Sequence, residues 1–506
     1  MKVLILGLGQ YPKGSGIAAA LFYAKRGDAV TVTDLKTAEE LKENVAQLKK
    51  FKNVRLVLGH HDLKDVREAE LIVRNPRVRS DSAEIVEAKK LGIPIESDIS
   101  LFLAHCPAHV IGITGTRGKS TTSALVAEML KSACYCDERM SLRGTKQSPD
   151  RTLRLPHSSD SLAMTEKSNV WLGGNILVSP LTFLSDVKND DWVVLELSSW
   201  QLEITGDKGI SPPVAVWTNL MRDHLNTYPG MEEYAEAKAQ IFRHQTQDGL
   251  VFLPSDKSFD VFANSAPGQV IRFGKKGDKA AQIVQSIKLK MIGEHNVTNA
   301  IIAATVALEL GVPVSAIKKV LKSFPGLPNR LEFVGTVNGV RFINDTTATT
   351  PDATIAAVKA LTPTKGTTPP PSPHHGGGGS DRISLLHEEG RGGVRSLHLL
   401  FGGADKELEF DELARVISDI TRFALPVSRY TIQVYLFPGT AHEKITRTFK
   451  SNHVAYQDME DMKAAMQTIK KSAKRGDVVL LSPGCASFGL FKNEFDRGEQ
   501  FKKLVK

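Results

Sequence analysis

The sequence predicts an α/β protein of three domains built on mainly parallel sheets, and three observations support this prediction. Short apolar runs alternate with amphipathic, helix-like stretches through most of the chain. A glycine-rich turn at residues 112–118 joins one such apolar run to a helix. The length of 506 residues is that of about three ordinary domains. The N-terminal and C-terminal domains are expected to be Rossmann-like.

The composition is that of an ordinary globular protein, with 41% hydrophobic and 24% charged residues. The formal net charge is +9, but the Lys and Arg residues are scattered and form no long block. A solvated basic surface is therefore favoured over a binding track for nucleic acid, and small anionic substrates would match the surplus charge equally well. We expect no nucleic-acid partner and a monomer.

The cysteines and the apolar runs together indicate a reducing, cytoplasmic location. The four cysteines form neither a disulfide framework nor a zinc-binding pattern. No stretch of 18 apolar residues occurs, so no membrane span is predicted. Residues 1–6 resemble the start of a signal peptide, but they run into Gly7 without a small-residue cleavage site, and a strand is the better interpretation.

The first 108 residues read as a βαβ domain. A buried-type strand at residues 3–8 is followed by a turn rich in glycine, a helix at 17–25 and a second strand that ends at Asp34. An acidic residue at that position lies where a ribose or base would bind. The turn does not have the G-x-G-x-x-G spacing, so a dinucleotide cofactor is only weakly indicated. Further strands are expected near residues 54–58, 71–74 and 93–95.

The central domain, expected at residues 109–327, begins with a phosphate-binding pattern. The strand at 109–111 leads into GITGTRGKSTT at 112–122, and a helix follows at 123–130. Gly118 would let the backbone approach a phosphate, Lys119 would reach the β- and γ-phosphates, and the Ser120 hydroxyl would bind Mg²⁺. The glycine spacing departs from a strict Walker A motif. The alternative, a glycine-rich turn with a surface lysine, is less favoured because the turn, the Lys-Ser pair and both flanks agree. A P-loop ATPase-like parallel sheet is therefore expected.

Three further residues follow this loop and could act with it. Glu196 lies in an apolar strand at 192–197, His224 follows a strand at 214–219, and Lys238 lies on a helix at 231–243. Ligands gather at the carboxyl ends of parallel strands, so these side chains and Ser120 could hold Mg²⁺ beside a triphosphate. Taken singly, each also has an ordinary reading, as a paired buried glutamate, a capping histidine or a solvated helix lysine.

Two segments do not fit the α/β alternation. Residues 134–168 have no period and are rich in Arg, Ser, Thr, Pro and Asp, which predicts an inserted, disordered segment. Residues 364–396 contain PPP and GGGGS and read as a flexible linker. A Pro/Gly-rich hinge at 324–330 precedes the C-terminal domain, expected at residues 328–506. Its strands are expected near residues 340–344, 397–401, 431–436 and 478–481.

Several of these stretches resemble the Mur ligase family. They are residues 112–122, LELSSWQLE at 195–203, NLMRDH at 219–224, GEHN at 293–296, GLPNR at 326–330, SPGCAS at 482–487 and the tail FKNEFDRG at 491–498. The 112–122 loop alone would fit either a Mur ligase or a folylpolyglutamate synthase. The resemblance covers nearly all of the chain outside the two inserted segments, and it is strongest to the family members that add D-glutamate.

The resemblance implies a three-domain ligase that uses ATP and Mg²⁺. The implied reaction adds D-glutamate to UDP-N-acetylmuramoyl-L-alanine in peptidoglycan synthesis, through an acyl phosphate that the D-glutamate amine attacks. The first domain would hold the UDP group, the second ATP, and the third the amino acid. Positioning and charge neutralisation at the γ-phosphate would carry the catalysis.

The resemblance also assigns roles to individual residues. Lys119, Glu196, His224 and Lys238 would be catalytic, and Ser120, Glu196, His224 and Lys238 would bind the metal, with Lys238 carbamylated. The implied ATP contacts are Gly115, Thr116, Gly118, Lys119, Ser120, Thr121, Asn296, Asn299, Arg330 and Asp345. The implied substrate contacts are Gly16, Asp34 and Lys36 for the uridine phosphate, Asn175 for the muramoyl group, and Thr349, Lys406, Ser487 and Phe488 for D-glutamate.

Alternatives remain open at this point. Thr347 stands where the family commonly has lysine, so a nearby cation would have to supply that charge. Another amide ligase of the same family is a near alternative. A nucleotide-binding module without catalysis is less favoured, because such a module needs no carbamylated lysine. An NAD-dependent oxidoreductase is least favoured, because the spacing of the first glycine loop is wrong.

Overall fold

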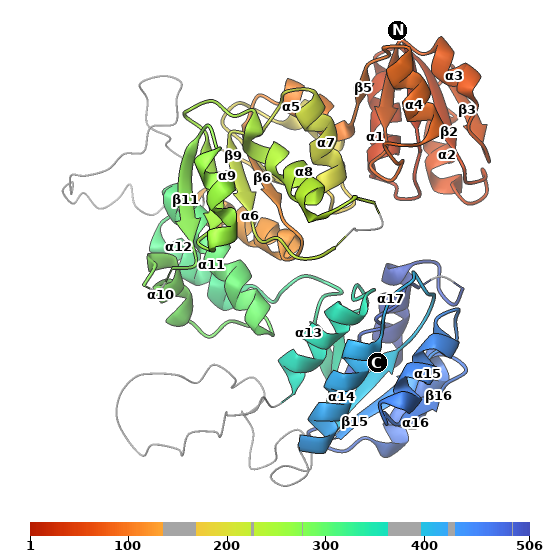
Figure 1. Ribbon diagram of the computed structural model, residues 1–506, viewed down its shortest axis with the longest axis vertical. Coiled ribbons are helices and arrows are strands. Elements are labelled where there is room, and N and C mark those ends of the chain that lie inside the picture. Colours follow the sequence, from red (N-terminus) through yellow and green to blue (C-terminus); the bar gives the residue numbers. More distant parts are fainter. Residues whose placement is uncertain (135–167, 224–226, 276, 363–395, 424–430, 488) are drawn as a thin grey trace, which may run out of the picture. The chain divides into compact units, whose positions relative to one another are not determined.

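The computed structural model describes residues 1–134, 168–223, 227–275, 277–362, 396–423, 431–487 and 489–506. The predicted insert at 134–168 and the predicted linker at 364–396 lie almost entirely outside the described residues. His224 and Phe488 also lie outside them. The described part of the chain forms three β-sheets (Figure 1).

The first sheet is parallel, with the strand order β3-β2-β1-β4-β5, which is a doubly wound order. The predicted strands at 54–58 and 71–74 coincide with β3 and β4. Its strands are β1 (Lys2–Leu6), β2 (Ala29–Asp34), β3 (Val54–Leu58), β4 (Leu71–Arg74) and β5 (Ile95–Glu96). The helices of this region are α1 (Ser15–Lys25), α2 (Lys42–Leu48), α3 (Leu63–Glu68), α4 (Ala83–Lys90) and α5 (Asp98–His105).

The second sheet is also parallel, with the order β11-β10-β9-β6-β8-β7. It places β6 between β8 and β9, so the strand before the phosphate loop is central. The strands are β6 (His109–Thr114), β7 (Val170–Gly174), β8 (Trp192–Glu196), β9 (Val214–Trp217), β10 (Leu250–Pro254) and β11 (Gln269–Phe273). Strands β7, β10 and β11 were not among the predicted strands.

Two helices of the central region carry predicted catalytic lysines, Lys119 on α6 and Lys238 on α8. Helix α6 packs against β7 and β8, and α8 packs against β6 and β9. The α-helices are α6 (Lys119–Cys134), α7 (Ser199–Asp207), α8 (Met231–Arg243), α9 (Asp260–Asn264), α10 (Lys279–Gln285), α11 (Glu294–Glu309) and α12 (Val314–Ser323). The 3₁₀ turns are η2 (Pro180–Thr182), η3 (Leu184–Asp186) and η4 (Lys257–Phe259).

The third sheet is mixed, with the order β12-β13-β17-β14-β15-β16. Its strands are β12 (Glu332–Val337), β13 (Val340–Asn344), β14 (Ser396–Phe401), β15 (Thr431–Leu436), β16 (Tyr456–Asp458) and β17 (Val478–Leu481). The helices are α13 (Pro351–Leu361), α14 (Asp411–Phe423), α15 (His442–Ser451), α16 (Met462–Ser472) and α17 (Glu494–Val505). Alternate strand residues enter two separate hydrophobic clusters, one on each face of the sheet.

One edge of the third sheet departs from the Rossmann-like expectation. Strand β12 pairs antiparallel with β13, whereas the other pairings of this sheet are parallel. The two strands are joined by Asn338 and Gly339, both at positive φ, of 52° and 79°. Asn-Gly is the preferred dipeptide for the turn of a two-residue hairpin. The Asn338-Gly339 pair in the sequence is therefore a local signal for this antiparallel pairing, which the expected strands did not include.

The described residues form two compact units, one of residues 1–287 and 298–321 and the other of 288–297 and 322–506. The first unit holds the first and second sheets, and the second unit holds the third. The predicted boundaries after residues 108 and 327 stay a prediction.

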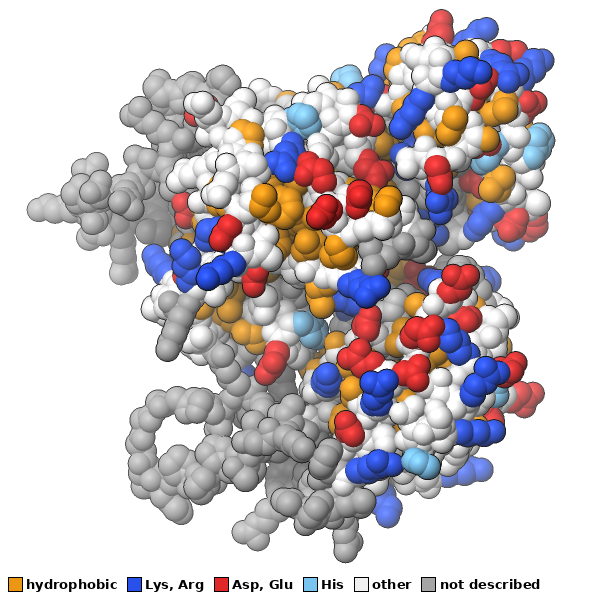
Figure 2. Space-filling view, viewed as in Figure 1, with side chains coloured by type: hydrophobic (Ala, Val, Ile, Leu, Met, Phe, Trp, Pro, Cys, Tyr) orange, Lys and Arg blue, Asp and Glu red, His pale blue; other side chains and the backbone are white. Residues whose placement is uncertain are grey.

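Acidic and basic side chains are interspersed over the face shown in Figure 2. Among the described helices, none is long and apolar enough to cross a membrane.

Candidate active site

The loop between β6 and α6 has, at two glycines, a backbone conformation that other residues rarely adopt. Gly115 has φ +144° and Gly118 has φ +81°. A side-chain carbon at Gly115 would overlap the Thr218 hydroxyl, and one at Gly118 would overlap the Asn299 side-chain oxygen. The loop therefore needs both glycines, for conformation and for space. Helix α6 begins at Lys119, earlier than predicted, so Lys119 and Ser120 lie in its first turn, where N–H groups favour anions.

Asn219, just after β9, holds this loop in place. Its side-chain oxygen accepts a hydrogen bond from Arg117 N at 2.9 Å, and its amide nitrogen donates to Arg117 O at 3.0 Å. The Asn219 carbonyl also accepts from Thr116 N at 3.1 Å, and the Thr218 hydroxyl donates to Arg117 O at 2.7 Å. Asn219 begins the NLMRDH stretch that resembles the Mur ligase family, but the sequence did not predict a role for it. A polar residue directly after a strand beside the phosphate loop was the available signal.

Two lysines meet at one carbonyl of the loop. Lys119 Nζ donates to Gly115 O at 2.9 Å and to Thr116 O at 3.0 Å, and Lys238 Nζ donates to the same Gly115 O at 3.0 Å. Lys238 Nζ also lies 4.3 Å from the centroid of the Tyr234 ring. Helix α8 thus places Lys238 directly behind the loop.

Lys238 is not a solvated helix lysine, because its side chain is only 1% exposed. Burial, with a smaller contribution from the nearby Lys119 charge, lowers the pKa of Lys238 from 10.5 to about 6, and Asp223 opposes the shift. A buried lysine behind a phosphate loop is poised to be an uncharged amine at neutral pH.

Glu196 ends β8 beside this loop and is 2% exposed. In the parallel register it lies opposite Ile113 of β6 and Gly174 of β7, so it sits at the carboxyl edge of the sheet. Its Oε1 accepts a hydrogen bond from Asn175 Nδ2 at 2.9 Å, whereas its Oε2 is buried without a hydrogen-bond partner among the described residues. Within the described part of the chain, the Glu196 carboxylate is thus bonded to a neutral amide through one oxygen, and the other oxygen could bind a cation.

The donor chemistry at this edge fits Mg²⁺, since an unpartnered carboxylate oxygen and a hydroxyl are hard oxygen ligands. Glu196 and Ser120 are the oxygen donors here, and Lys238 would be a third if carbamylated. No group of three or more His, Cys, Asp or Glu side chains that could hold a metal occurs within the described residues, from which His224 is absent.

The predicted uridine-phosphate residues lie around the first glycine loop. Asp34 accepts hydrogen bonds from Gly9 N and Lys36 N, both at 2.9 Å, so it anchors the loop to the end of β2. A side chain at Gly16 would overlap the Gly7 carbonyl. Asn44, which sequence reasoning missed, donates from its side chain to Gly9 O at 2.6 Å.

In the second unit, three loops that carry predicted amino-acid contacts converge. Gly402 N donates to Pro483 O at 2.9 Å, Ala404 N to Ala486 O at 3.0 Å, and Gly484 N to Ala348 O at 2.8 Å. These backbone bonds connect the loops that carry Lys406, Ser487 and Thr349, which lie far apart in the sequence.

The other predicted nucleotide contacts divide between the two units. Asn299, 5% exposed, lies against Gly118 in the first unit, whereas Asn296, Arg330 and Asp345 belong to the second. Burial raises the pKa of Asp345 to about 7, although Ser482 Oγ donates to its carboxylate at 2.9 Å. The hydroxyl of Thr347, the position of the family lysine, donates to Asn329 O at 2.8 Å, so this side chain caps a turn.

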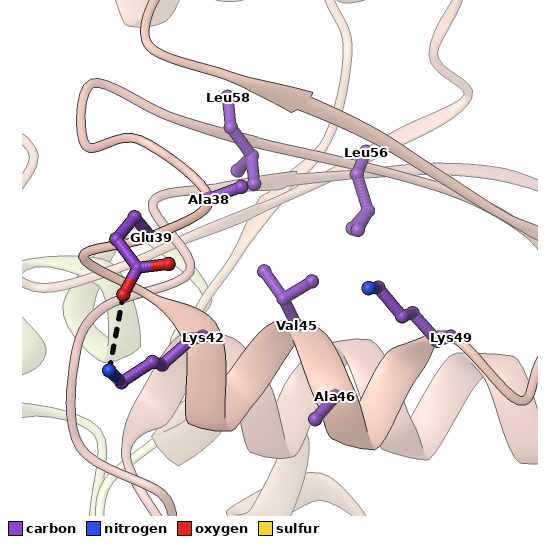
Figure 3. Close-up of a pocket in the computed structure, with 8 residues that line it drawn as sticks. All are labelled: Ala38, Glu39, Lys42, Val45, Ala46, Lys49, Leu56 and Leu58. Carbon is purple, nitrogen blue, oxygen red and sulfur yellow. Dashed lines mark hydrogen bonds and ion pairs between the residues drawn. The ribbon is translucent and has the colours of Figure 1, made fainter.

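One surface pocket lies apart from all of these residues. It has a volume of about 470 Å³ and lies between α2 and the edge strand β3, with Val45, Leu56 and Leu58 on its apolar side (Figure 3). Lys42 and Glu39 form an ion pair of 3.1 Å at its rim. None of the predicted site residues lines it.

The chain matches two family models, described as the Mur ligase MurD-like N-terminal domain over residues 1–97 and the Mur ligase middle domain over residues 113–307. It is similar to the UDP-N-acetylmuramoylalanine–D-glutamate ligase of a Roseiflexus species, with 33% identity over 100% of this chain and 98% of that protein. It is also similar to the ligase of the same name from Borreliella afzelii, with 31% identity over 100% and 97% of the two chains.

A solved structure supports the fold. The UDP-N-acetylmuramate–alanine ligase of Thermotoga maritima has a TM-score of 0.54 and 17% identity, over 100% of this chain and 99% of that one. The similarity to the D-glutamate ligases spans the whole length of this chain. This protein belongs to the Mur ligase family.

Proposed function

We propose that this protein is the ATP-dependent ligase that adds D-glutamate to UDP-N-acetylmuramoyl-L-alanine in peptidoglycan synthesis. The observation that carries the proposal is the full-length similarity, above 30% identity, to two ligases named for that reaction. The arrangement of Lys119, Glu196 and Lys238 around the phosphate loop supports it, because a non-catalytic module would not need a buried lysine there.

The reaction has two steps. An oxygen of the substrate carboxylate forms a bond to the γ-phosphorus of ATP, the bond to the bridging oxygen breaks, and ADP leaves. The unprotonated amine of D-glutamate then bonds to the carbon of the acyl phosphate, phosphate leaves and the amine loses a proton. Both steps need charge neutralisation and alignment more than covalent help from the protein.

The residues of the first unit supply most of that neutralisation. Lys119, which donates to two loop carbonyls here, would turn to the β- and γ-phosphates, and the N–H groups of the first turn of α6 would bind the same anion. Mg²⁺, when bound, offsets the phosphate charge, and Ser120, Glu196 and His224 would hold it. Asn175, which donates to Glu196, would connect the muramoyl group to the metal ligand.

Carbamylation of Lys238 is part of the proposal. An ammonium beside Mg²⁺ would repel the metal, whereas a carbamate supplies oxygen ligands. The burial of this lysine behind the loop, beside the Glu196 edge of the sheet, supports that role.

The remaining assignments follow the resemblance. Gly16, Asp34 and Lys36 would bind the uridine phosphate. Gly115, Thr116, Gly118, Thr121, Asn296, Asn299, Arg330 and Asp345 would contact ATP. Thr349, Lys406, Ser487 and Phe488 would bind D-glutamate, and the backbone bonds that join their loops support this assignment.

The test is phosphate release by the purified full-length protein with ATP, Mg²⁺, UDP-N-acetylmuramoyl-L-alanine and one amino acid at a time. We expect release with D-glutamate and not with L-glutamate, L-alanine or meso-diaminopimelate. The Lys119→Ala variant should lose a factor of about 10²–10³ in turnover, since it removes one preorganised contact to the transferred charge. Lys131→Ala, which breaks a surface ion pair on the same helix, is the matched control. Release with another amino acid would indicate a sister ligase, and release with none a binding module.

A further inference from the structure

Arg497 on α17 is a fully buried cation, 0% exposed, that the proposed mechanism does not use. It forms no ion pair with a carboxylate among the described residues. Burial lowers its pKa to about 10, a shift that the nearby Cys485 and Glu494 oppose. A guanidinium taken out of water needs several well-placed acceptors to offset the lost hydration, so its partners show why it is there.

Its partners belong to two loops. Arg497 Nε donates to the Thr346 hydroxyl at 3.0 Å, and one terminal nitrogen donates to the Thr346 carbonyl at 2.8 Å. The other terminal nitrogen donates to the Cys485 carbonyl at 3.3 Å. The planar fork of arginine thus spans the loop after β13 and the loop after β17, which a lysine could not do.

Both loops carry residues assigned above to the amino-acid and nucleotide sites. Thr346 lies next to Asp345 and three residues before Thr349, and Cys485 lies two residues before Ser487. The loops are also joined directly, because Gly484 N donates to Ala348 O at 2.8 Å. Arg497 therefore connects the two loops that carry the proposed D-glutamate contacts Thr349 and Ser487.

A second observation shows that α17 is fitted to this contact. A side-chain carbon at Gly498 would lie 2.6 Å from the Asn329 side-chain oxygen and 2.8 Å from Thr346 Cγ2. The glycine after Arg497 thus permits the helix to approach the Thr346 loop closely. The hydroxyl of Thr346 in turn donates to Glu494 O at 2.8 Å, which ties the same loop to the start of α17.

We propose that Arg497 is a positioning residue for the amino-acid site. Its guanidinium fixes the loops at 345–349 and 484–487, so that Thr349 and Ser487 are held in the relative positions that D-glutamate binding requires. This inference rests on the proposed function, whose D-glutamate contacts it concerns. Arg497 itself touches no substrate. The contrasting account makes it a purely structural residue that stabilises the fold of the second unit.

The test compares three variants of the full-length protein. Arg497→Lys keeps a cation but cannot span both loops. Thr346→Val removes the hydroxyl that accepts from Arg497 Nε and leaves the guanidinium in place. It tests the same contact if Arg497→Lys fails to fold. Lys502→Met is the matched control on the same helix, because Lys502 pairs with Glu332 at 3.5 Å and Glu499 at 2.6 Å, and neither carboxylate belongs to the two loops.

We expect Arg497→Lys to raise KM for D-glutamate by about tenfold or more, because a small misplacement of positioning groups is costly. KM for the UDP-linked substrate should stay within about twofold, because its proposed contacts lie in the first unit. Thr346→Val should act in the same direction by a smaller factor. Lys502→Met should lower Tm and leave both KM values unchanged.

Amide hydrogen exchange gives a readout that does not depend on activity. Residues 345–349 and 484–487 should exchange faster in Arg497→Lys than in Lys502→Met. If the wild-type protein does not accept D-glutamate, the proposed function fails, and the exchange data still test the loop positioning. Unchanged exchange in both loops, or equal rises in KM for both substrates, would overturn the role of Arg497.

Discussion

Lys119 and Lys238 donate to the same carbonyl, yet their surroundings give them different chemistry. Lys119 lies half-buried in the first turn of α6, where it can swing toward a phosphate. Lys238 is buried, with a pKa lowered to about 6. Because the folded-state pKa lies below the unfolded one, protonation favours unfolding, and the Lys238 contribution to stability falls as the pH is lowered from about 10.5 to about 6. At neutral pH the side chain is the free amine that can add carbon dioxide.

The residue-scale prediction concerns Lys238→Ala. The variant should lose most of its ligase activity, because it lacks the oxygen ligands that the proposed carbamate would offer Mg²⁺. Acetate should partly restore activity by filling the vacated space and supplying oxygen ligands. The measurement is initial rate at saturating ATP with and without acetate, with Lys131→Ala as the control that acetate should not affect. Full activity of Lys238→Ala without acetate would remove this lysine from the site.

At the scale of elements, the phosphate loop before α6 packs closely against α11, where Gly118 lies against Asn299. Gly118 and Gly311 have the same φ, +81°, but a side chain at Gly118 would overlap Asn299, whereas nothing lies within 4 Å of one at Gly311. The pair therefore separates backbone strain from steric overlap.

Gly311→Ala should cost about 1–2 kcal/mol of stability, from left-handed strain alone, and leave nucleotide binding unchanged. Gly118→Ala should carry the same strain and in addition displace Asn299 and the loop, so that nucleotide affinity falls by at least tenfold. Calorimetric titration with a non-hydrolysable ATP analogue and thermal unfolding measure the two effects. Equal nucleotide affinities in the two variants would refute the steric argument.

At the scale of the whole molecule, Asp98 joins the first and second sheets within the first unit. It lies at the start of α5, is 1% exposed, and accepts a hydrogen bond from Ser179 Oγ at 2.7 Å. Ser179 N also donates to Lys13 O of the first glycine loop at 2.8 Å. Burial raises the pKa of Asp98, and the bond from Ser179 only partly opposes this.

Because the folded-state pKa of Asp98 is raised, its favourable contribution is present below the ordinary carboxyl pKa and is lost as the pH rises through the folded-state value. Asp98→Asn should therefore gain stability relative to the wild type as the pH is raised from 4 to 8. Thermal midpoints across that range measure the difference. Asp81→Asn is the control, since the Arg79 hydrogen bond lowers the pKa of that exposed carboxyl, so its trend should be small or opposite. A constant offset for Asp98→Asn would contradict the prediction.

The sequence by itself determined the positions of many helices and strands and the phosphate loop, because these depend on local patterns. The helix predicted at 231–243 coincides with α8, and the strands predicted at 340–344, 431–436 and 478–481 coincide with β13, β15 and β17. Apolar periodicity and glycine conformation are properties of neighbouring residues, so they can be read without the fold. The phosphate loop and the sets of candidate residues at strand ends were available for the same reason.

Contacts between residues that are far apart in the sequence could be identified only from the tertiary structure. Lys238 and Gly115 are separated by 123 positions, and Arg497 and Thr346 by 151. Whether Lys238 is solvated or buried and whether Asn219 anchors the phosphate loop both depend on which strands become neighbours. Strand order is set by the packing of whole sheets and helices rather than by any local pattern, and so the tertiary fold alone decided them.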